Sequence, residues 1–408
     1  MIINIAQFLV LGLIIEWAFR KLKMPGLLGM LILGFLFGPY ALDLINPNLM
    51  AVSEELRLIA LIIILLRAGF ELSKDVLKSL GSRIILLAIV PAIIECFAIM
   101  ILGPLLLDLS YFESVILGTI LAAVSPAVVF PLMIRFKNKG MGVKKGIPDL
   151  ILAMVSLDDV FVIFVYSILI NSYIGGSNNI LVELLGVPIS ILLGIFAGLI
   201  IGYFLFLIFR KFGIRSTKQV LILIGLSVIL VQTEHILQPT ISFTALLSIM
   251  AMAFMILQQD QEMSFAIAKK LEKIWVFAEI VLFTLVGSQV NFEVAIKTGL
   301  AGTAIILFGL FARSIGTYLC LLGSSLRTSE KIFVIISYLP KATVQAAIGA
   351  APLAAMTAAG METGPGEIIL AIAFLSIIIT APLGAWAITT VGQKVLKIEP
   401  PSFKTLIK

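Results

Sequence analysis

Charge is scarce in this chain. Only 13% of its 408 residues are Asp, Glu, Lys or Arg, whereas 61% are hydrophobic, and the mean hydropathy is +1.16. Soluble domains carry roughly 25% charged residues, which they need to cover their surface. Hydrophobic runs recur from residue 2 to residue 392, so segments long enough to span a membrane occupy nearly the whole chain. The composition therefore predicts an all-α polytopic membrane protein.

Cysteine and histidine are almost absent, with two and one residues respectively. Cys96 and Cys320 both fall inside apolar runs, where a free thiol packs as a small hydrophobic side chain. Their spacing gives neither a zinc site nor a disulfide framework. We find no glycine-rich nucleotide loop, metal cluster or nucleophile–base set. The sequence thus indicates a protein that is not an enzyme and has no cofactor.

Thirteen membrane spans fit the hydrophobic runs. They are expected near residues 2–19, 26–42, 55–72, 84–107, 112–135, 147–171, 183–209, 218–234, 241–258, 275–290, 299–323, 331–356 and 366–391. With the N-terminus outside, 24 of the 29 basic residues fall in inward segments and one, Lys297, in an outward loop. Such asymmetry is typical of a multi-pass protein of the cell (inner) membrane with a cytoplasmic C-terminus. The net charge of +6 therefore does not indicate nucleic-acid binding.

Two prolines lie in the middle of predicted spans. Pro126 and Pro340 are each flanked by small or polar residues, and the preceding span carries a charge in each case, Glu95 and Arg313. A proline in mid-helix removes a backbone hydrogen bond and kinks or unwinds the helix. Each alone could mark an ordinary kink, but the matched neighbours predict two inverted six-helix repeats, spans 1–6 and 8–13. Each repeat would contain one discontinuous crossing helix.

An adjacent pair of aspartates, Asp158 and Asp159, sits near the middle of the sixth predicted span. Carboxylates at that depth are costly to insert and persist when they are paired or functional. A carboxylate that binds either a proton or a hard cation, but not both, provides the chemistry of an exchanger. The hydroxyls of Ser156 and Ser125 could complete an oxygen shell for Na⁺ or Li⁺. The alternative is that both aspartates form structural salt bridges only.

Two basic residues inside spans are candidate partners for these acids. We expect Arg313 to pair with Asp158 or its vicinity, and Lys341 to pair with Glu95. Both pairs would compensate buried charge in the core, mainly as structural contacts.

Four sequence segments together resemble a known family. They are Ser125-Pro126-Ala-Val-Val, Gly146-Ile-Pro, Ser156-Leu-Asp158-Asp159 and Leu339-Pro340-Lys341-Ala-Thr-Val-Gln-Ala-Ala-Ile-Gly. They resemble the monovalent cation/proton antiporter-2 family, and most closely its sodium/hydrogen exchangers of the NHA type. The resemblance covers essentially the whole chain. It implies a homodimer that exchanges monovalent cations for protons by elevator-like alternating access. Asp159 would be the ion and proton carrier, and Asp158 its companion.

The resemblance also implies a division into a dimerisation domain and a core ion-transport domain joined by a linker helix. On this sequence the dimerisation domain would comprise residues 1–80 and 213–297, the linker 180–212, and the core 81–175 and 298–408. Some bacterial relatives place a lysine opposite the aspartates, where this chain offers Arg313. Arginine does not readily release its proton, so the resemblance leaves the proton-to-cation stoichiometry open.

Two other functions remain open at this stage. A potassium-efflux channel or K⁺/H⁺ exchanger of the same family would usually carry a cytosolic nucleotide-binding domain. A sodium-coupled symporter for an organic solute would need a roomier polar cavity and gives no particular reason for adjacent aspartates.

Overall fold

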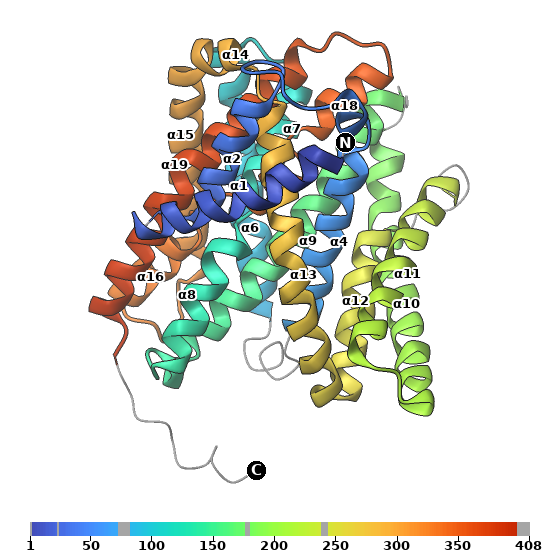
Figure 1. Ribbon diagram of the computed structural model, residues 1–408. Coiled ribbons are helices and arrows are strands. Elements are labelled where there is room, and N and C mark those ends of the chain that lie inside the picture. The colour runs from blue at the N-terminus through green and yellow to red at the C-terminus, as the bar shows by residue number, and fades with distance from the viewer. Residues whose placement is uncertain (1, 23, 72–81, 176–179, 238–243, 398–408) are drawn as a thin grey trace. The chain divides into compact units, whose positions relative to one another are not determined.

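A computed structural model describes residues 2–22, 24–71, 82–175, 180–237 and 244–397, and every regular element in these ranges is a helix (Figure 1). The helices are α1 Ile2–Lys21, α2 Gly26–Phe37, α3 Pro47–Ala51, α4 Ser53–Glu71, α6 Ser82–Leu107, α7 Tyr111–Ala122, α8 Pro126–Asn138, η1 Val143–Lys145, α9 Ile147–Gly175, α10 Ile180–Phe212, α11 Ser216–Leu237, α12 Ala245–Gln259, α13 Gln261–Ser288, α14 Phe292–Lys297, α15 Gly299–Cys320, α16 Thr328–Ser337, α17 Thr343–Ile348, α18 Ala351–Ala358 and α19 Gly364–Val395.

The all-α prediction is confirmed, and the long helices follow the predicted spans in order. In the described ranges, eight segments are long and apolar enough to cross a membrane, and three shorter apolar segments lie at 26–37, 245–259 and 343–358. The total of thirteen spans and the inverted repeat stay predictions. Residues 72–81 contain the predicted domain boundary at 80, and they lie outside the described residues, as do 241–243 and the tail from 398.

Helix α13 begins well before the membrane span predicted within it. The tenth span was expected to begin at residue 275, but α13 already begins at Gln261. The carboxylate of Asp260 accepts a hydrogen bond from the backbone N–H of Met263 at 2.9 Å, which is the N-cap arrangement that starts a helix. The charged segment before residue 275 is therefore the first part of the same helix.

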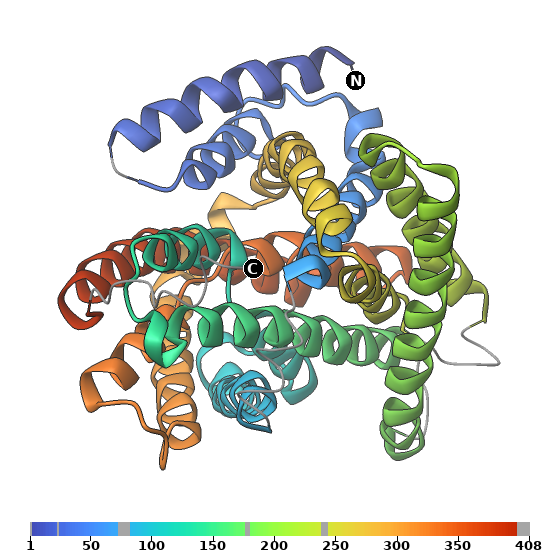
Figure 2. The same ribbon diagram turned by 90° about the horizontal axis from the view of Figure 1, so that it is seen from below.

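The chain forms two compact units. Unit one comprises residues 1–74, 163–292 and 346–367, and contains α1 to α4 and α10 to α13. Within it α1 lies beside α2, as Figure 2 shows, and α2 packs against α13.

Glycines bring two helices of unit one into backbone contact. Gly194, Gly198 and Gly202 recur every fourth residue of α10 and face α12. A Cβ built on Gly198 would lie 2.2 Å from the backbone oxygen of Ser248, and the hydroxyl of Ser248 donates to the carbonyl of Gly194 at 2.7 Å. Small residues at this spacing allow helices to pack without intervening side chains.

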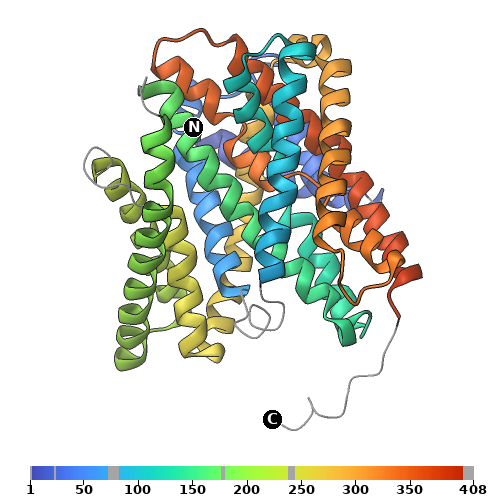
Figure 3. The same cartoon turned by 180° about the vertical axis from the view of Figure 1, so that it is seen from behind.

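Unit two comprises residues 75–162, 293–345 and 368–408. Its helices α6 and α15 pack side by side, as seen in Figure 3, and α7 packs against α6. A buried apolar cluster joins the beginning of α9 to α8, α16 and α19; its members include Val129, Met154, Phe333 and Ile388. This packing fixes the ends of the interrupted helices that carry the candidate site.

An ion pair joins η1 to the first turn of α16 in unit two. Lys145, at the end of η1, lies 2.7 Å from the carboxylate of Glu330 in the first turn of α16. The same carboxylate accepts from the backbone N–H of Arg327 at 2.7 Å. Burial alone would raise the pKa of the Glu330 carboxyl, but the hydrogen bonds from Lys145 and Arg327 outweigh it and hold the pKa below its ordinary value.

Gly198→Ala is expected to lower the free energy of unfolding by about 2 kcal/mol, because the added methyl group must push two backbones apart. Gly225→Ala is the matched control, since a Cβ at Gly225 of α11 meets nothing within 4 Å. Thermal unfolding of both variants in detergent gives the comparison. Equal melting temperatures for the two variants would contradict the close packing of α10 on α12.

Glu330→Gln is expected to destabilise the protein at neutral pH and to lose this effect in acid. A carboxyl whose pKa is lowered on folding contributes stability above its unfolded pKa, about 4.3, and loses it as the pH falls through the folded value. Melting temperatures of wild type and variant should therefore converge below that range. Glu362→Gln, at an exposed position, serves as the control. A constant difference at all pH values would contradict the ion pair.

Candidate functional site

The first predicted interruption is present in the structure. Helix α7 ends at Ala122, Ala123 and Ser125 are extended, and α8 begins with Pro126 at its first position. Proline suits that position because the first helical N–H has no partner within the helix. The backbone N–H of Ser125 donates to the carbonyl of Pro340 at 2.8 Å, so the first break contacts the second one.

The second interruption lies between α16, which ends at Ser337, and α17, which begins at Thr343. The residues between them are not helical and include Pro340. The backbone N–H of Lys341 donates to the hydroxyl of Thr380 in α19 at 2.8 Å. Backbone groups freed at membrane depth must find partners inside the protein, and here the partners come from neighbouring helices and the other break.

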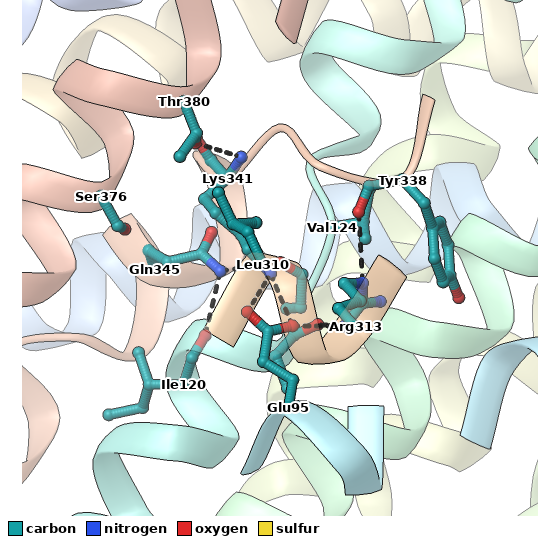
Figure 4. Close-up of polar contacts among 12 residues, drawn as sticks. Glu95, Ile120, Val124, Leu310, Arg313, Tyr338, Lys341, Gln345, Ser376 and Thr380 are labelled. Carbon is teal, nitrogen blue, oxygen red and sulfur yellow. Dashed lines mark hydrogen bonds and ion pairs between the residues drawn. The ribbon is translucent and has the colours of Figure 1, made fainter. Parts of the chain in front are cut away.

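Arg313 lies between the two breaks and is fully buried (Figure 4). Its Nη1 donates to Glu95 at 2.8 Å and to the carbonyl of Ala122, and its Nη2 donates to Asp158 at 2.7 Å. Its Nε donates to the carbonyl of Tyr338 at 3.2 Å, and the guanidinium lies 4.2 Å from the centre of that ring. The two carbonyls end α7 and follow α16, where helices carry unpaired acceptors and partial negative charge.

The predicted ion pairs are confirmed. Arg313 pairs with Asp158, and the Nζ of Lys341 lies 2.9 Å from the carboxylate of Glu95. The structure adds a third ion pair, between Arg313 and Glu95, which the sequence did not predict. Glu95 therefore bridges two cations, and all four side chains are at most 2% exposed.

The two aspartates differ in their surroundings. Both oxygens of Asp158 accept a hydrogen bond, one from Arg313 and the other from the backbone N–H of Val124 at 3.0 Å. Asp159 is 2% exposed, and its Oδ1 has no hydrogen-bond partner. The hydroxyl of Ser125 is likewise buried without a partner. An unpaired carboxylate oxygen and an unpaired hydroxyl are suited to a proton or a hard cation.

The remaining predicted ligand, Ser156, is buried, but its hydroxyl donates to the carbonyl of Leu152 in its own helix at 2.9 Å. The oxygen keeps lone pairs that could accept a cation. Sequence reasoning missed Tyr338, Gln345 and Thr380. Tyr338 and Gln345 are polar residues of the apolar segment around Pro340 and Lys341, and Thr380 is a polar residue in the last predicted span. A polar side chain in an apolar segment was the only sequence signal for these three residues.

The buried charges in this cluster do not cancel. Glu95, Asp158 and Asp159 are acidic, whereas Arg313 and Lys341 are basic. With all five ionised the cluster would carry one negative charge in excess, and uncompensated buried charge is strongly unfavourable. One proton or one monovalent cation would neutralise it.

Two interrupted apolar helices that meet beside a buried ionisable cluster define a class: membrane proteins that carry small ions through a site inside the bilayer. Comparison with known sequences makes the class specific. The profile of the transmembrane sodium/hydrogen exchanger family matches residues 8–394. The chain therefore belongs to the sodium/hydrogen exchanger family, whose members are multi-pass membrane transporters and not enzymes, and cation/proton exchange is its activity class.

Individual relatives agree with this assignment. The chain is 33% identical to the human sodium/hydrogen exchanger 9B2 over 387 residues, covering 92% of this chain and 70% of that one. It is 30% identical to human sodium/hydrogen exchanger 9B1, covering 91% and 73%. The fold is similar to the solved structure of the sodium proton antiporter MjNhaP1 from Methanocaldococcus jannaschii, with a TM-score of 0.82 at 21% identity over 97% of this chain and 98% of that one.

Arg313→Gln is expected to lower the free energy of unfolding by about 3–5 kcal/mol, because it leaves buried carboxylates short of a cation. The readout is the fraction of monodisperse protein after extraction, together with its melting temperature. Arg20→Gln removes the exposed partner of Glu16 and should cost less than about 1 kcal/mol. If Arg313→Gln were as stable as Arg20→Gln, the cluster would not depend on Arg313.

Proposed function

We propose that this protein exchanges Na⁺ or Li⁺ for H⁺ by alternating access, with cation and proton competing for the buried pair Asp158 and Asp159. The observation that carries the proposal is the single excess negative charge of the cluster, together with the unpartnered Oδ1 of Asp159. Such a site must bind one positive charge, which can be either a proton or a monovalent cation. Because the two exclude each other, the movement of one ion is coupled to that of the other.

Asp159 is the carrier in this proposal, and Asp158 is its companion. The oxygens of Asp158 accept hydrogen bonds from Arg313 and from the Val124 N–H, whereas Asp159 Oδ1 and Ser125 Oγ have no hydrogen-bond partner. Ser156 could add a further oxygen. Hard oxygen ligands suit Na⁺ and Li⁺, and protonation of Asp159 would remove the main charge that holds the cation.

The charge count favours one proton for each cation. Arg313 keeps its charge throughout a cycle because a guanidinium does not readily release its proton. The pairs of Arg313 and Lys341 with Glu95 and Asp158 then remain as charge compensation in the core. Neutralising the cluster therefore takes one cation during transport in one direction and one proton during transport in the other.

The proposed movement rests on the division of the chain into two compact units. Unit two contains the cluster and both interruptions and corresponds largely to the proposed core domain. Unit one contains most of the proposed dimerisation domain and the linker α10. We assign the protein to the cell membrane, with the N-terminus outside and the C-terminus in the cytoplasm, on the distribution of its basic residues. The homodimer is proposed on the family resemblance alone. Elevator-like displacement of the core would expose the cluster to each side in turn.

Asp159→Asn is expected to abolish cation-driven proton movement. The protein would be reconstituted in liposomes that hold a pH-sensitive dye, and Na⁺, Li⁺ or K⁺ added outside. Asp149→Asn is the matched control, since Asp149 lies in the first turn of the same helix and pairs with Lys137. It should retain exchange, because its ion pair is half-exposed and lies far from the cluster along α9.

Each outcome of this assay is informative. Exchange with Na⁺ or Li⁺ in wild type and in Asp149→Asn, but not in Asp159→Asn, supports the proposal. Exchange that persists in Asp159→Asn removes Asp159 from the ion path. A response to K⁺ alone favours the potassium branch of the family. Proton movement that changes with an imposed voltage contradicts the exchange of one charge for one charge.

A further inference from the structure

Gln345, in α17, makes contacts that the exchange mechanism above does not use. Its side chain is fully buried in unit two. Its Nε2 donates to the carbonyls of Ile120 and Ala123, both at 2.9 Å, so both amide hydrogens bind backbone carbonyls at the end of α7. Figure 4 shows the side chain reaching from the second interrupted helix to Ile120 of the first.

These two carbonyls lost their usual partners when α7 was interrupted. In a continuous helix the carbonyl of Ile120 would accept from the N–H of Val124, four residues later. Here the N–H of Val124 donates to Asp158. The carbonyl of Ala123 lies in the extended segment before Pro126. The Gln345 amide replaces the missing donor at both positions.

One peptide group links Gln345 to the candidate ion site. The carbonyl of Ala123 and the N–H of Val124 are opposite ends of the same planar peptide bond. Gln345 holds the carbonyl end at 2.9 Å, and the Oδ2 of Asp158 accepts from the N–H end at 3.0 Å. Because the peptide is rigid, turning one end turns the other. The orientation of the N–H toward Asp158 is therefore set from the far side by Gln345.

We propose that Gln345 is a positioning residue for ion binding, which orients the Ala123–Val124 peptide and thereby the carboxylate of Asp158 beside Asp159. It touches neither the cation nor the proton. It also keeps two orphan carbonyls satisfied, so that they do not compete for the transported cation. This inference rests on the proposed role of the aspartate pair.

The test compares Gln345→Met with wild type in the liposome assay. Methionine has nearly the same length and volume but donates no hydrogen bond. We expect the apparent KM for Na⁺ to rise about tenfold while the rate at saturating Na⁺ stays within about twofold, because two buried hydrogen bonds that organise the site are lost. Thr119→Val is the matched control, since the Thr119 hydroxyl donates to the Val115 carbonyl within α7 and contacts the thiol of Cys96, so that it binds no backbone group of the interruption.

A binding measurement separates positioning from a general loss of stability. A cation that binds the folded protein raises its melting temperature by an amount that falls as the affinity falls. In Gln345→Met the rise caused by Na⁺ should shrink by the amount that a roughly tenfold weaker affinity predicts, whereas in Thr119→Val it should match wild type. In an Asp158→Asn background, Gln345→Met should bring no further loss, because the path through Asp158 is already broken.

A wild-type KM in Gln345→Met, or an equal change in Thr119→Val, overturns the proposal. A variant that only lowers the melting temperature and leaves the Na⁺-induced rise intact also overturns it, because the role is then structural. If Gln345→Met does not fold, Gln345→Asn, whose amide is one methylene short of the carbonyls, takes its place with the same criteria. These failures leave exchange and its loss in Asp159→Asn unaffected, so they are distinct from a failure of the proposed function.

Discussion

The guanidinium group of Arg313 is the contact on which unit two depends. It binds two carboxylates, Glu95 and Asp158, and the carbonyls that end two interrupted helices. A planar group with five donors is suited to this task, because a lysine could offer only a single point of charge. Each acceptor would be costly to bury alone. Together they fix the position of α15 against both interruptions, and the stack on Tyr338 holds the plane of the group.

Arg313 does not bind every acidic group of the cluster, and the unpaired group is the one suited to bind an ion. Both oxygens of Asp158 accept hydrogen bonds, but its neighbour Asp159 has an oxygen with no partner. Adjacent residues on a helix point in directions about 100° apart, so the chain can give two identical side chains opposite environments. One aspartate completes the hydrogen-bonded network, and the other keeps an unpaired oxygen, which the proposed exchange assigns to the transported ion. Gln345 acts on the first of these, at one remove from the ion.

Much of this arrangement was predictable from the sequence because its causes are local. Proline within an apolar run cannot sustain a helix, so the interruptions at Pro126 and Pro340 were predicted. Charge at membrane depth needs a partner of opposite sign, and the predicted spans contain few charged residues. The ion pairs of Arg313 with Asp158 and of Lys341 with Glu95 could therefore be predicted. The roles of Gln345 and of the carbonyls of α7 were not predictable in this way. A glutamine in an apolar helix must find partners, but nothing in the sequence tells which backbone groups, some 220 residues away, those will be.

The glycine contacts of α10 have a kinematic consequence. The backbone of Gly198 lies against that of Ser248, so at this contact no side chains separate α10 from α12. No side chain there can change its rotamer to let one helix slide past the other. The two helices can move only as one rigid body. Bending of the chain in this region is therefore favoured at the ends of α10, and directly after its last residue Gly213, with a φ of 55°, provides a joint that a residue with a side chain would resist.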